Sequence, residues 1–176
     1  MEAAEADMFD AYYKIQEAEE FFAKKYNVDL RRDEETQLKW EKLDKLTIYT
    51  RELSIAFFQV DAPLSAFFSA AEAKKGDTLN DIIGDIRQSV RKSQDAADDM
   101  AEFDGRDNLL EELKAYLTDV RESIDETIRP LADQLSNNFL PEDEYDDVRD
   151  ELEDLKDWHA KARADFFETQ AYIVLE

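Results

Sequence analysis

The chain has no cysteine, a single histidine, and only 3 glycines and 3 prolines among its 176 residues. The lack of cysteine excludes disulfides, zinc–thiolate sites, iron–sulfur clusters and thiol catalysis. Sheets and irregular loops need turn residues, whereas long helices do not. Hydrophobic residues make up 43% of the chain and aromatic residues 11%, which is enough for a core. The composition therefore predicts one all-α domain over residues 1–176.

Basic residues are also few: 22 Lys and Arg stand against 45 Asp and Glu, which gives a formal net charge of −23. Nucleic acids and anionic membranes are bound by basic surfaces, so direct binding to either is not expected. A basic protein is the partner class that this charge favours. No stretch approaches the roughly 18 to 20 apolar residues of a membrane span, so no transmembrane segment is predicted.

Apolar residues recur at steps of three and four along the chain, which is the spacing of amphipathic helices. Helices are predicted over about 2–26, 34–75, 77–100, 108–135 and 141–176. Connections of a few residues indicate antiparallel neighbours. The expected fold is an up-and-down antiparallel bundle of about four or five long helices.

Two of these helices contain proline, which removes a backbone donor and should kink each helix. After Pro63 the helix could instead restart, with Asp61 as a new cap. Pro130 should bend the second half of the fourth helix. Gly76, with Lys74 and Lys75 before it, is expected to end the second helix.

Each predicted helix has a core-facing seam. In the first it is Phe9, Tyr12, Tyr13, Gln16, Phe22 and Tyr26. In the second it is Leu38, Leu46, Tyr49, Leu53, Phe57, Val60, Leu64, Phe67 and Ala71. In the third it is Leu79, Ile83, Ile86, Val90, Ser93, Ala97 and Met100. In the fourth it is Leu113, Leu117, Val120, Ile124, Ile128, Leu131 and Leu135. In the fifth it is Tyr145, Val148, Leu152, Leu155, His159, Ala162, Phe166, Thr169 and Ile173.

Two local features refine this picture. Ser93 and Ala97 are small, so another helix could approach closely there. The stretch 55–58 is apolar on all sides, so the second helix is expected to be the central one.

His159 is the one residue with ready acid–base or metal-binding chemistry. A carboxylate-bundle metal site would need Glu-x-x-His pairs, but Lys156 precedes His159 by three residues and no second histidine exists. A histidine packed at a helix interface is the favoured interpretation. The segment 104–108 resembles the start of a calcium loop but lacks further oxygen ligands and a closing glutamate, so it is predicted to be a turn. We therefore predict no enzyme, and no catalytic, cofactor-binding or metal-binding residue.

Aspartates recur along the third and fifth helices. A carboxylate surface could imitate the phosphates of a nucleic acid and capture a basic protein. The alternatives are a solvated helix face and adaptation to high salt. The residues are Asp95, Asp98, Asp99, Asp143, Asp146, Asp147, Asp150, Asp154 and Asp157.

Three Phe–Phe pairs occur, at 57–58, 67–68 and 166–167. Adjacent residues on a helix point about 100° apart, so each pair covers a wide face. The favoured interpretation is that these helices have neighbours on several sides. The alternative is an exposed aromatic patch for a partner or an apolar ligand.

The run from Leu53 to Asp77 and the turn from Met100 to Leu110 resemble the middle of a family of all-helical bacterial surface lipoproteins. In that family an Ala-Phe-Phe helix leads to a Lys-Lys-Asp-like turn, and a Phe-x-Gly-Asp turn precedes the next long helix. The resemblance covers about residues 46–128. It implies a location at the cell surface if an N-terminal signal was removed; otherwise a cytoplasmic location is expected. This chain lacks the family's lysine-rich character and its lipid-accepting cysteine.

The sequence thus leaves three functional hypotheses open. The first is a non-enzymatic helical scaffold or binding module with an acidic exterior. The second is an acidic mimic that captures a basic, nucleic-acid-binding protein. The third is a small enzyme that uses His159.

Overall fold

The computed structural model describes residues 14, 15, 17–28, 34–73, 75–104, 108–136 and 142–175. The chain divides into two compact units, Met1–Asp44 and Lys45–Glu176. The boundary falls inside one uninterrupted helix. The single domain over residues 1–176 therefore stays a prediction.

The described residues form helices and connections, which confirms the all-α prediction. The elements are α2 (Glu34–Glu72), α3 (Gly76–Asp99), α4 (Asn108–Ser123), the π-helical turn η1 (Ile124–Ile128), α5 (Arg129–Leu135) and α6 (Glu142–Leu175). Residues 17–26 are also helical and belong to the first unit.

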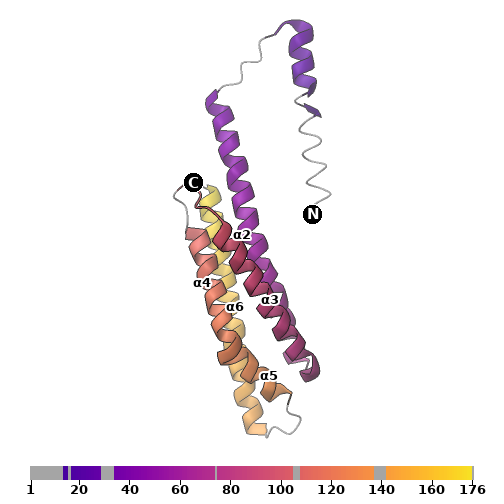
Figure 1. Ribbon diagram of the computed structural model, residues 1–176, viewed down its shortest axis with the longest axis vertical. Helices are drawn as coiled ribbons and strands as arrows, with labels where there is room; N and C mark the ends of the chain where they lie inside the picture. The colour runs from indigo at the N-terminus through magenta and orange to yellow at the C-terminus, as the bar shows by residue number, and fades with distance from the viewer. Residues whose placement is uncertain are drawn as a thin grey trace. The chain divides into compact units, whose positions relative to one another are not determined.

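The second unit is a four-helix bundle in which the chain runs alternately up and down (Figure 1). Its helices are the part of α2 from Lys45 onward, α3, the composite α4–η1–α5, and α6. The composite helix packs against α3 on one side and against α6 on the other. Hydrogen bonds join α2 to α3 and to α6. The Ser93 hydroxyl of α3 donates to the Ala56 carbonyl at 2.8 Å, and Gln170 of α6 donates to the Ser54 hydroxyl at 3.0 Å.

Most residues of the predicted seams form the core of this bundle, whereas Leu38 of the second seam, which belongs to the first unit, is 65% exposed. Every seam residue of α3 before Met100 is buried, and so is every seam residue of the composite helix before Leu135. At the centre, the Phe57 ring stacks on Phe166 at 4.4 Å and on Tyr116 at 4.7 Å between centroids. One aromatic side chain of α2 thus joins α4 and α6 across the core. The predicted close approach at Ser93 is confirmed by its hydrogen bond to α2.

The expectation that α2 is the central helix was wrong. Ile55 is 47% exposed and Phe58 is 43% exposed. In a four-helix bundle each helix occupies a corner and buries only the faces that its neighbours cover. Two of the four consecutive apolar residues at 55–58 therefore face outward.

Proline has different consequences in the two helices that contain it. α2 continues through Pro63, and Asp61 is a buried residue of that helix, so the restart with an Asp61 cap was wrong. Before Pro130 the helix widens into η1, where the Arg129 N–H donates to the Ile124 carbonyl five residues back. Such π-turns are a recognised cause of helix bending.

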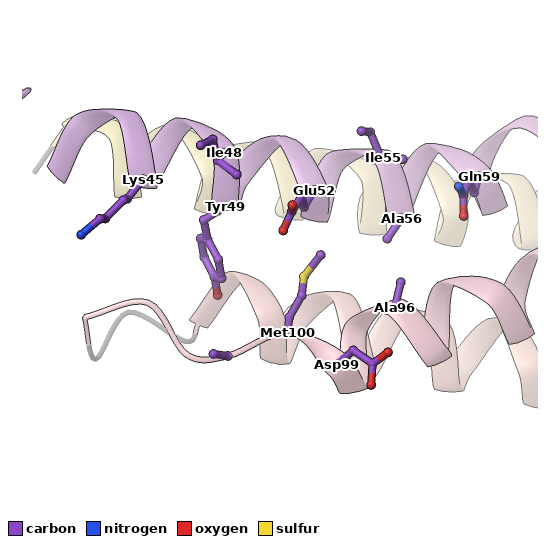
Figure 2. A pocket seen from close by; sticks show the side chains of 11 residues that line it. Lys45, Ile48, Tyr49, Glu52, Ile55, Ala56, Gln59, Ala96, Asp99 and Met100 are labelled. Atoms are coloured by element: carbon purple, nitrogen blue, oxygen red, sulfur yellow. The ribbon is translucent and has the colours of Figure 1, made fainter. Parts of the chain in front are cut away.

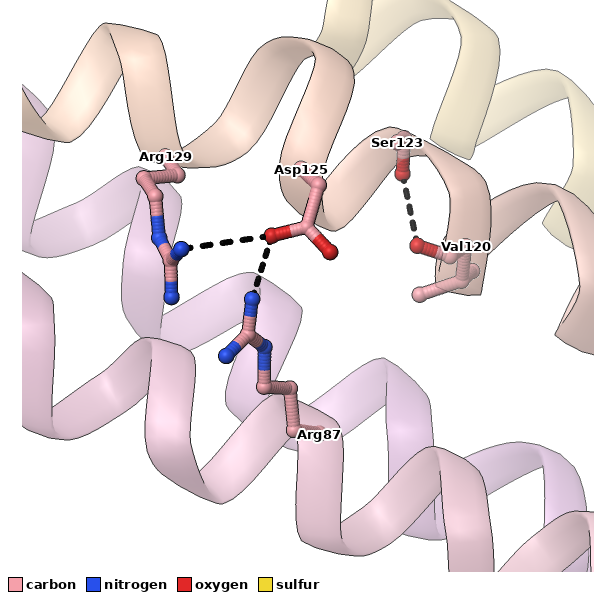
Figure 3. A network of polar contacts seen from close by, with 5 residues as sticks. All are labelled: Arg87, Val120, Ser123, Asp125 and Arg129. Atoms are coloured by element: carbon pink, nitrogen blue, oxygen red, sulfur yellow. Dashed lines mark hydrogen bonds and ion pairs between the residues drawn. The ribbon is translucent and has the colours of Figure 1, made fainter.

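The π-turn also directs a carboxylate toward α3. Asp125 accepts a hydrogen bond from Arg87 of α3 and lies 3.5 Å from the Arg129 guanidinium (Figure 3). Arg87 belongs to α3, Asp125 to η1 and Arg129 to α5. A nonlocal ion pair therefore accompanies the local change in helix type.

The predicted end of α2 was misplaced. The helix ends at Glu72 without a basic residue in its last turn, and the Lys75 N–H closes it by donating to the Ala70 carbonyl at 3.0 Å. Gly76 instead begins α3. A Cβ atom on Gly76 would lie 2.8 Å from Ser136 Cα, so glycine is needed there for the close approach of α5.

In the first unit, the helix over residues 17–26 ends where predicted. Asn27 has a φ of 53°, and the Val28 N–H donates to the Ala23 carbonyl at 3.0 Å, as in a Schellman C-cap. Of the predicted seam, Phe22 and Tyr26 are exposed. Its other members, Phe9, Tyr12, Tyr13 and Gln16, lie outside the described residues.

By length and composition alone, the helix Glu35–Glu72 could cross a membrane. Half of its apolar 18-residue window is buried inside the structure, and the core helix of a bundle meets the same criteria. The absence of a transmembrane segment therefore stays a prediction.

Candidate functional site

A groove of about 590 Å³ lies between α2 and the C-terminal end of α3 (Figure 2). This volume is in the range of known small-molecule sites. Both helices and the first two residues of the connection that follows α3 contribute to it. The lining residues are Lys45, Ile48, Tyr49, Glu52, Ile55, Ala56, Gln59, Ala96, Asp99, Met100 and Ala101.

The groove exists because the side chains where α2 faces the end of α3 are small. Ala56 on α2 and Ala96 on α3 leave space between the two helices. Tyr49 of α2 and Met100, which directly follows α3, point into the groove from its two sides (Figure 2). The Tyr49 ring also stacks on Phe103 at 5.3 Å, which holds the α3–α4 connection against α2.

Two isoleucines make the groove apolar on the α2 side. Ile48 is 55% exposed and Ile55 is 47% exposed. They are seven residues apart and therefore lie on one face of the helix. Covering the exposed half of an isoleucine contributes about 1 kcal/mol, so the pair offers a partner about 2 kcal/mol.

Charged groups flank this apolar surface. Lys45, Glu52 and Asp99 line the groove, and Glu52 points toward α3 (Figure 2). Asp95 precedes Asp99 by four residues and therefore lies on the same side of α3. Asp95 and Glu102, which follows α3, are both exposed. The groove thus combines an apolar floor with a mainly acidic edge.

A second, smaller pocket of about 220 Å³ lies between α4 and α6. Tyr116, Trp158 and Phe166 supply its aromatic lining, and Lys161 and Asp165 lie at its edge. It belongs to the same region of the bundle as the single histidine.

His159 is buried, as the sequence predicted, with 5% of its surface exposed. Its ring lies 5.5 Å from Phe68 and 6.2 Å from Tyr116 between centroids. Nε2 lies 3.3 Å from Asp61 Oδ1 but has no hydrogen-bond partner among the described residues. Arg163 reaches both carboxylate oxygens of Asp61 at 3.4 Å.

This buried environment perturbs two pKa values. Burial lowers the pKa of His159; Asp61 opposes that shift, and Arg163 adds to it. Burial, together with the negative charge of Asp61, raises the pKa of Tyr116 well above its ordinary value. Both side chains are therefore neutral near pH 7. Tyr116 lines the smaller pocket, whereas His159 is enclosed beside Asp61.

The aspartates of the third and fifth helices do not form one continuous face. Asp95, Asp98 and Asp99 lie at the C-terminal end of α3, whereas those of α6 lie in its N-terminal half, at the opposite end of the bundle (Figure 1). Within α6 alone, the exposed carboxylates are dense. They are Glu144, Asp146, Asp147, Asp150, Glu151, Glu153, Asp154 and Asp157.

The structure also bears on the predicted turn at 104–108 and on the three Phe–Phe pairs. The turn at 104–108 is supported by Asp104, whose φ is 54°, although residues 105–107 lie outside the described part. No group of three or more His, Cys, Asp or Glu side chains that could hold a metal occurs among the described residues. In the Phe–Phe pairs, only Phe58 is exposed. The groove was not predicted from the sequence. The available signal was Ile48, a large apolar residue of α2 that lies outside the predicted seam and lines the groove.

No family model, curated protein or solved structure matches this chain. The resemblance to helical bacterial surface lipoproteins therefore stays a prediction, as does the location that it implies.

Proposed function

We propose that this chain is a non-enzymatic binding module whose α2–α3 groove binds one amphipathic helix of a partner protein. The observation that carries the proposal is the groove itself. It is an apolar surface between two helices, on a bundle whose exterior is otherwise rich in charge. Large exposed apolar patches with polar rims commonly mark interaction sites.

The dimensions of the groove favour a helix as its occupant. The lining residues of α2 run from Lys45 to Gln59. At a rise of 1.5 Å per residue, this face is about 21 Å long, which is close to four helical turns. An amphipathic helix would place an apolar stripe along Ile48 and Ile55 and complete a three-helix contact with α2 and α3.

The position of His159 does not support a catalytic role for the groove. The chain has one histidine, and it is buried beside Asp61 and Arg163 rather than in the groove. The groove is lined by Lys45, Glu52 and Asp99 but contains no nucleophile with an adjacent base.

The test is binding of a labelled helical peptide of about 14 residues, with leucines along one face and glutamine and alanine elsewhere. We expect the double variant Ile48→Ser/Ile55→Ser to weaken binding about tenfold or more, because about 2 kcal/mol of apolar contact is lost. The matched control is Tyr172→Ser, which removes an exposed aromatic residue of α6. Equal binding to the double variant, or to a peptide of scrambled order, would contradict the proposal.

A second candidate function is capture of a basic protein by the carboxylates of α6. Its support is the density of exposed acidic side chains from Glu144 to Asp157. Replacing Asp147, Glu151 and Asp154 by their amides should then weaken binding to a basic partner, because three of the eight exposed carboxylates are lost. The Ile48→Ser/Ile55→Ser variant should leave that binding intact, which separates this function from the first.

A further inference from the structure

The C-terminal end of α3 is electrostatically unfavourable as it stands. A helix carries a partial negative charge at its C-terminus, where basic side chains are stabilising and acidic ones are not. α3 nevertheless ends with Asp98 and Asp99 and has no basic residue in its last turn. Asp95 lies one turn earlier and is also exposed. Negative charge therefore accumulates at the end of α3, where Asp99 lines the groove.

The bundle itself neutralises little of this charge. Asp98 lies 3.7 Å from the Lys114 ammonium of α4. Asp95, Asp99 and Glu102 form no ion pair among the described residues. Across the groove, Glu52 of α2 points toward the same region (Figure 2). Lys45 is the one basic residue of the lining.

We infer that the groove selects a cationic amphipathic helix, with Lys or Arg side chains beside its apolar stripe that meet Glu52, Asp95 and Asp99. This inference rests on the proposed function and names the partner class. Charge complementarity supports a cationic helix. Lys or Arg side chains beside the groove would be attracted both to the carboxylates and to the partial negative charge at the C-terminal end of α3. The chain's formal charge of −23 would also attract such a partner over a longer range, and salt would weaken that attraction.

The experiment compares three peptides that share one leucine stripe and carry lysine, glutamine or glutamate at the flanking positions. The full chain is titrated with each. We expect the lysine peptide to bind at least about tenfold more tightly than the glutamine peptide, and the glutamate peptide to bind most weakly.

A matched pair of variants locates the effect. Glu52→Gln/Asp95→Asn/Asp99→Asn removes two carboxylates that line the groove and the neighbouring Asp95. Asp147→Asn/Glu151→Gln/Asp154→Asn removes three exposed carboxylates on α6. The two variants have the same net charge. We expect only the first to reduce lysine-peptide affinity toward the value for the glutamine peptide. Removing carboxylates at the end of α3 should not lower the melting temperature of the protein. Unfolding of the variant would therefore not account for the loss of peptide affinity.

The possible failures are distinguishable. If the glutamine and lysine peptides bind equally at the groove, the partner is not selected by charge, and the inference fails while the proposed function stands. If both variants weaken lysine-peptide binding to the same extent, the attraction is a property of the whole surface, and the inference again fails. If no peptide depends on Ile48 and Ile55, the proposed function fails as well.

Discussion

Asp61 of α2 and His159 of α6 meet inside the bundle, with Oδ1 and Nε2 3.3 Å apart and both side chains less than a tenth exposed. The cation that balances this carboxylate is Arg163, whose side chain is 47% exposed. The pair Asp61–Arg163 thus connects the core to the surface. Because His159 is neutral near pH 7, the guanidinium is the main compensation for a buried negative charge.

The first prediction concerns this compensation. Arg163→Met keeps most of the aliphatic stem but leaves the Asp61 carboxylate without its cation, so it should reduce the free energy of unfolding by about 1–3 kcal/mol. In a chain that already carries Asp61→Asn, the same change should cost less than about 0.5 kcal/mol. Denaturant unfolding of the four proteins in this double-mutant cycle measures the difference. Equal costs in both backgrounds would mean that Arg163 does not act through Asp61.

The second prediction concerns pH. Burial lowers the pKa of His159, whereas in the unfolded chain it titrates near its ordinary value of about 6.5. The unfolded state therefore binds more protons as the pH falls below that value, and stability is lost. Relative to His159→Gln, the wild type should lose up to about 1 kcal/mol between pH 7.5 and 5.5. A difference between the two proteins that does not change with pH would contradict the lowered pKa.

The third prediction concerns the Tyr116 hydroxyl, which is buried without a hydrogen-bond partner among the described residues. Tyr116→Phe removes this group and keeps the stack on Phe57, so stability should be unchanged or up to about 1 kcal/mol higher. Tyr116→Leu loses the stack and should cost about 2 kcal/mol or more. Thermal and denaturant unfolding can compare the two variants. A clear loss of stability in Tyr116→Phe would show that the hydroxyl is bonded after all.

The fourth prediction compares two glycines of α3. A Cβ on Gly76 would lie 2.8 Å from Ser136 Cα and 3.3 Å from the Leu135 carbonyl oxygen, so Gly76→Ala should destabilise by about 1–3 kcal/mol. A Cβ on Gly84 would meet nothing within 4 Å. Gly84→Ala should therefore stabilise the helix by about 0.5–1 kcal/mol. A Gly76→Ala variant as stable as the wild type or more stable would contradict the close packing of α5 on Gly76.

The sequence predicted the seams because burial on a helix follows its period. Leu79, Ile83, Ile86 and Val90 step by four, three and four, and all four are buried. Such a pattern needs no knowledge of the partner helix. It identifies the face that is buried but not how many of the other faces remain open. Ile55 illustrates this limit: the run 55–58 is apolar on all sides and predicted a central helix, but Ile55 is 47% exposed.

The remaining features depend on contacts between distant residues. Gly76 was interpreted as a helix end, whereas its role comes from Ser136, 60 residues later. The groove depends on where α3 ends relative to α2 and on the small volumes of Ala56 and Ala96. The π-turn before Pro130 is accompanied by Asp125 and its partner Arg87 on α3. None of these pairings is encoded in local periodicity.

The most direct test of the account follows the Met100 methyl group by NMR. The chain has three methionines, of which Met100 lines the groove, and Met100→Leu would assign its signal. Titration with the leucine–lysine peptide should shift the Met100 signal to saturation, and Ile48→Ser/Ile55→Ser should greatly reduce that shift. If the peptide binds while the Met100 signal stays unchanged, the groove is not the binding site and the central claim is wrong.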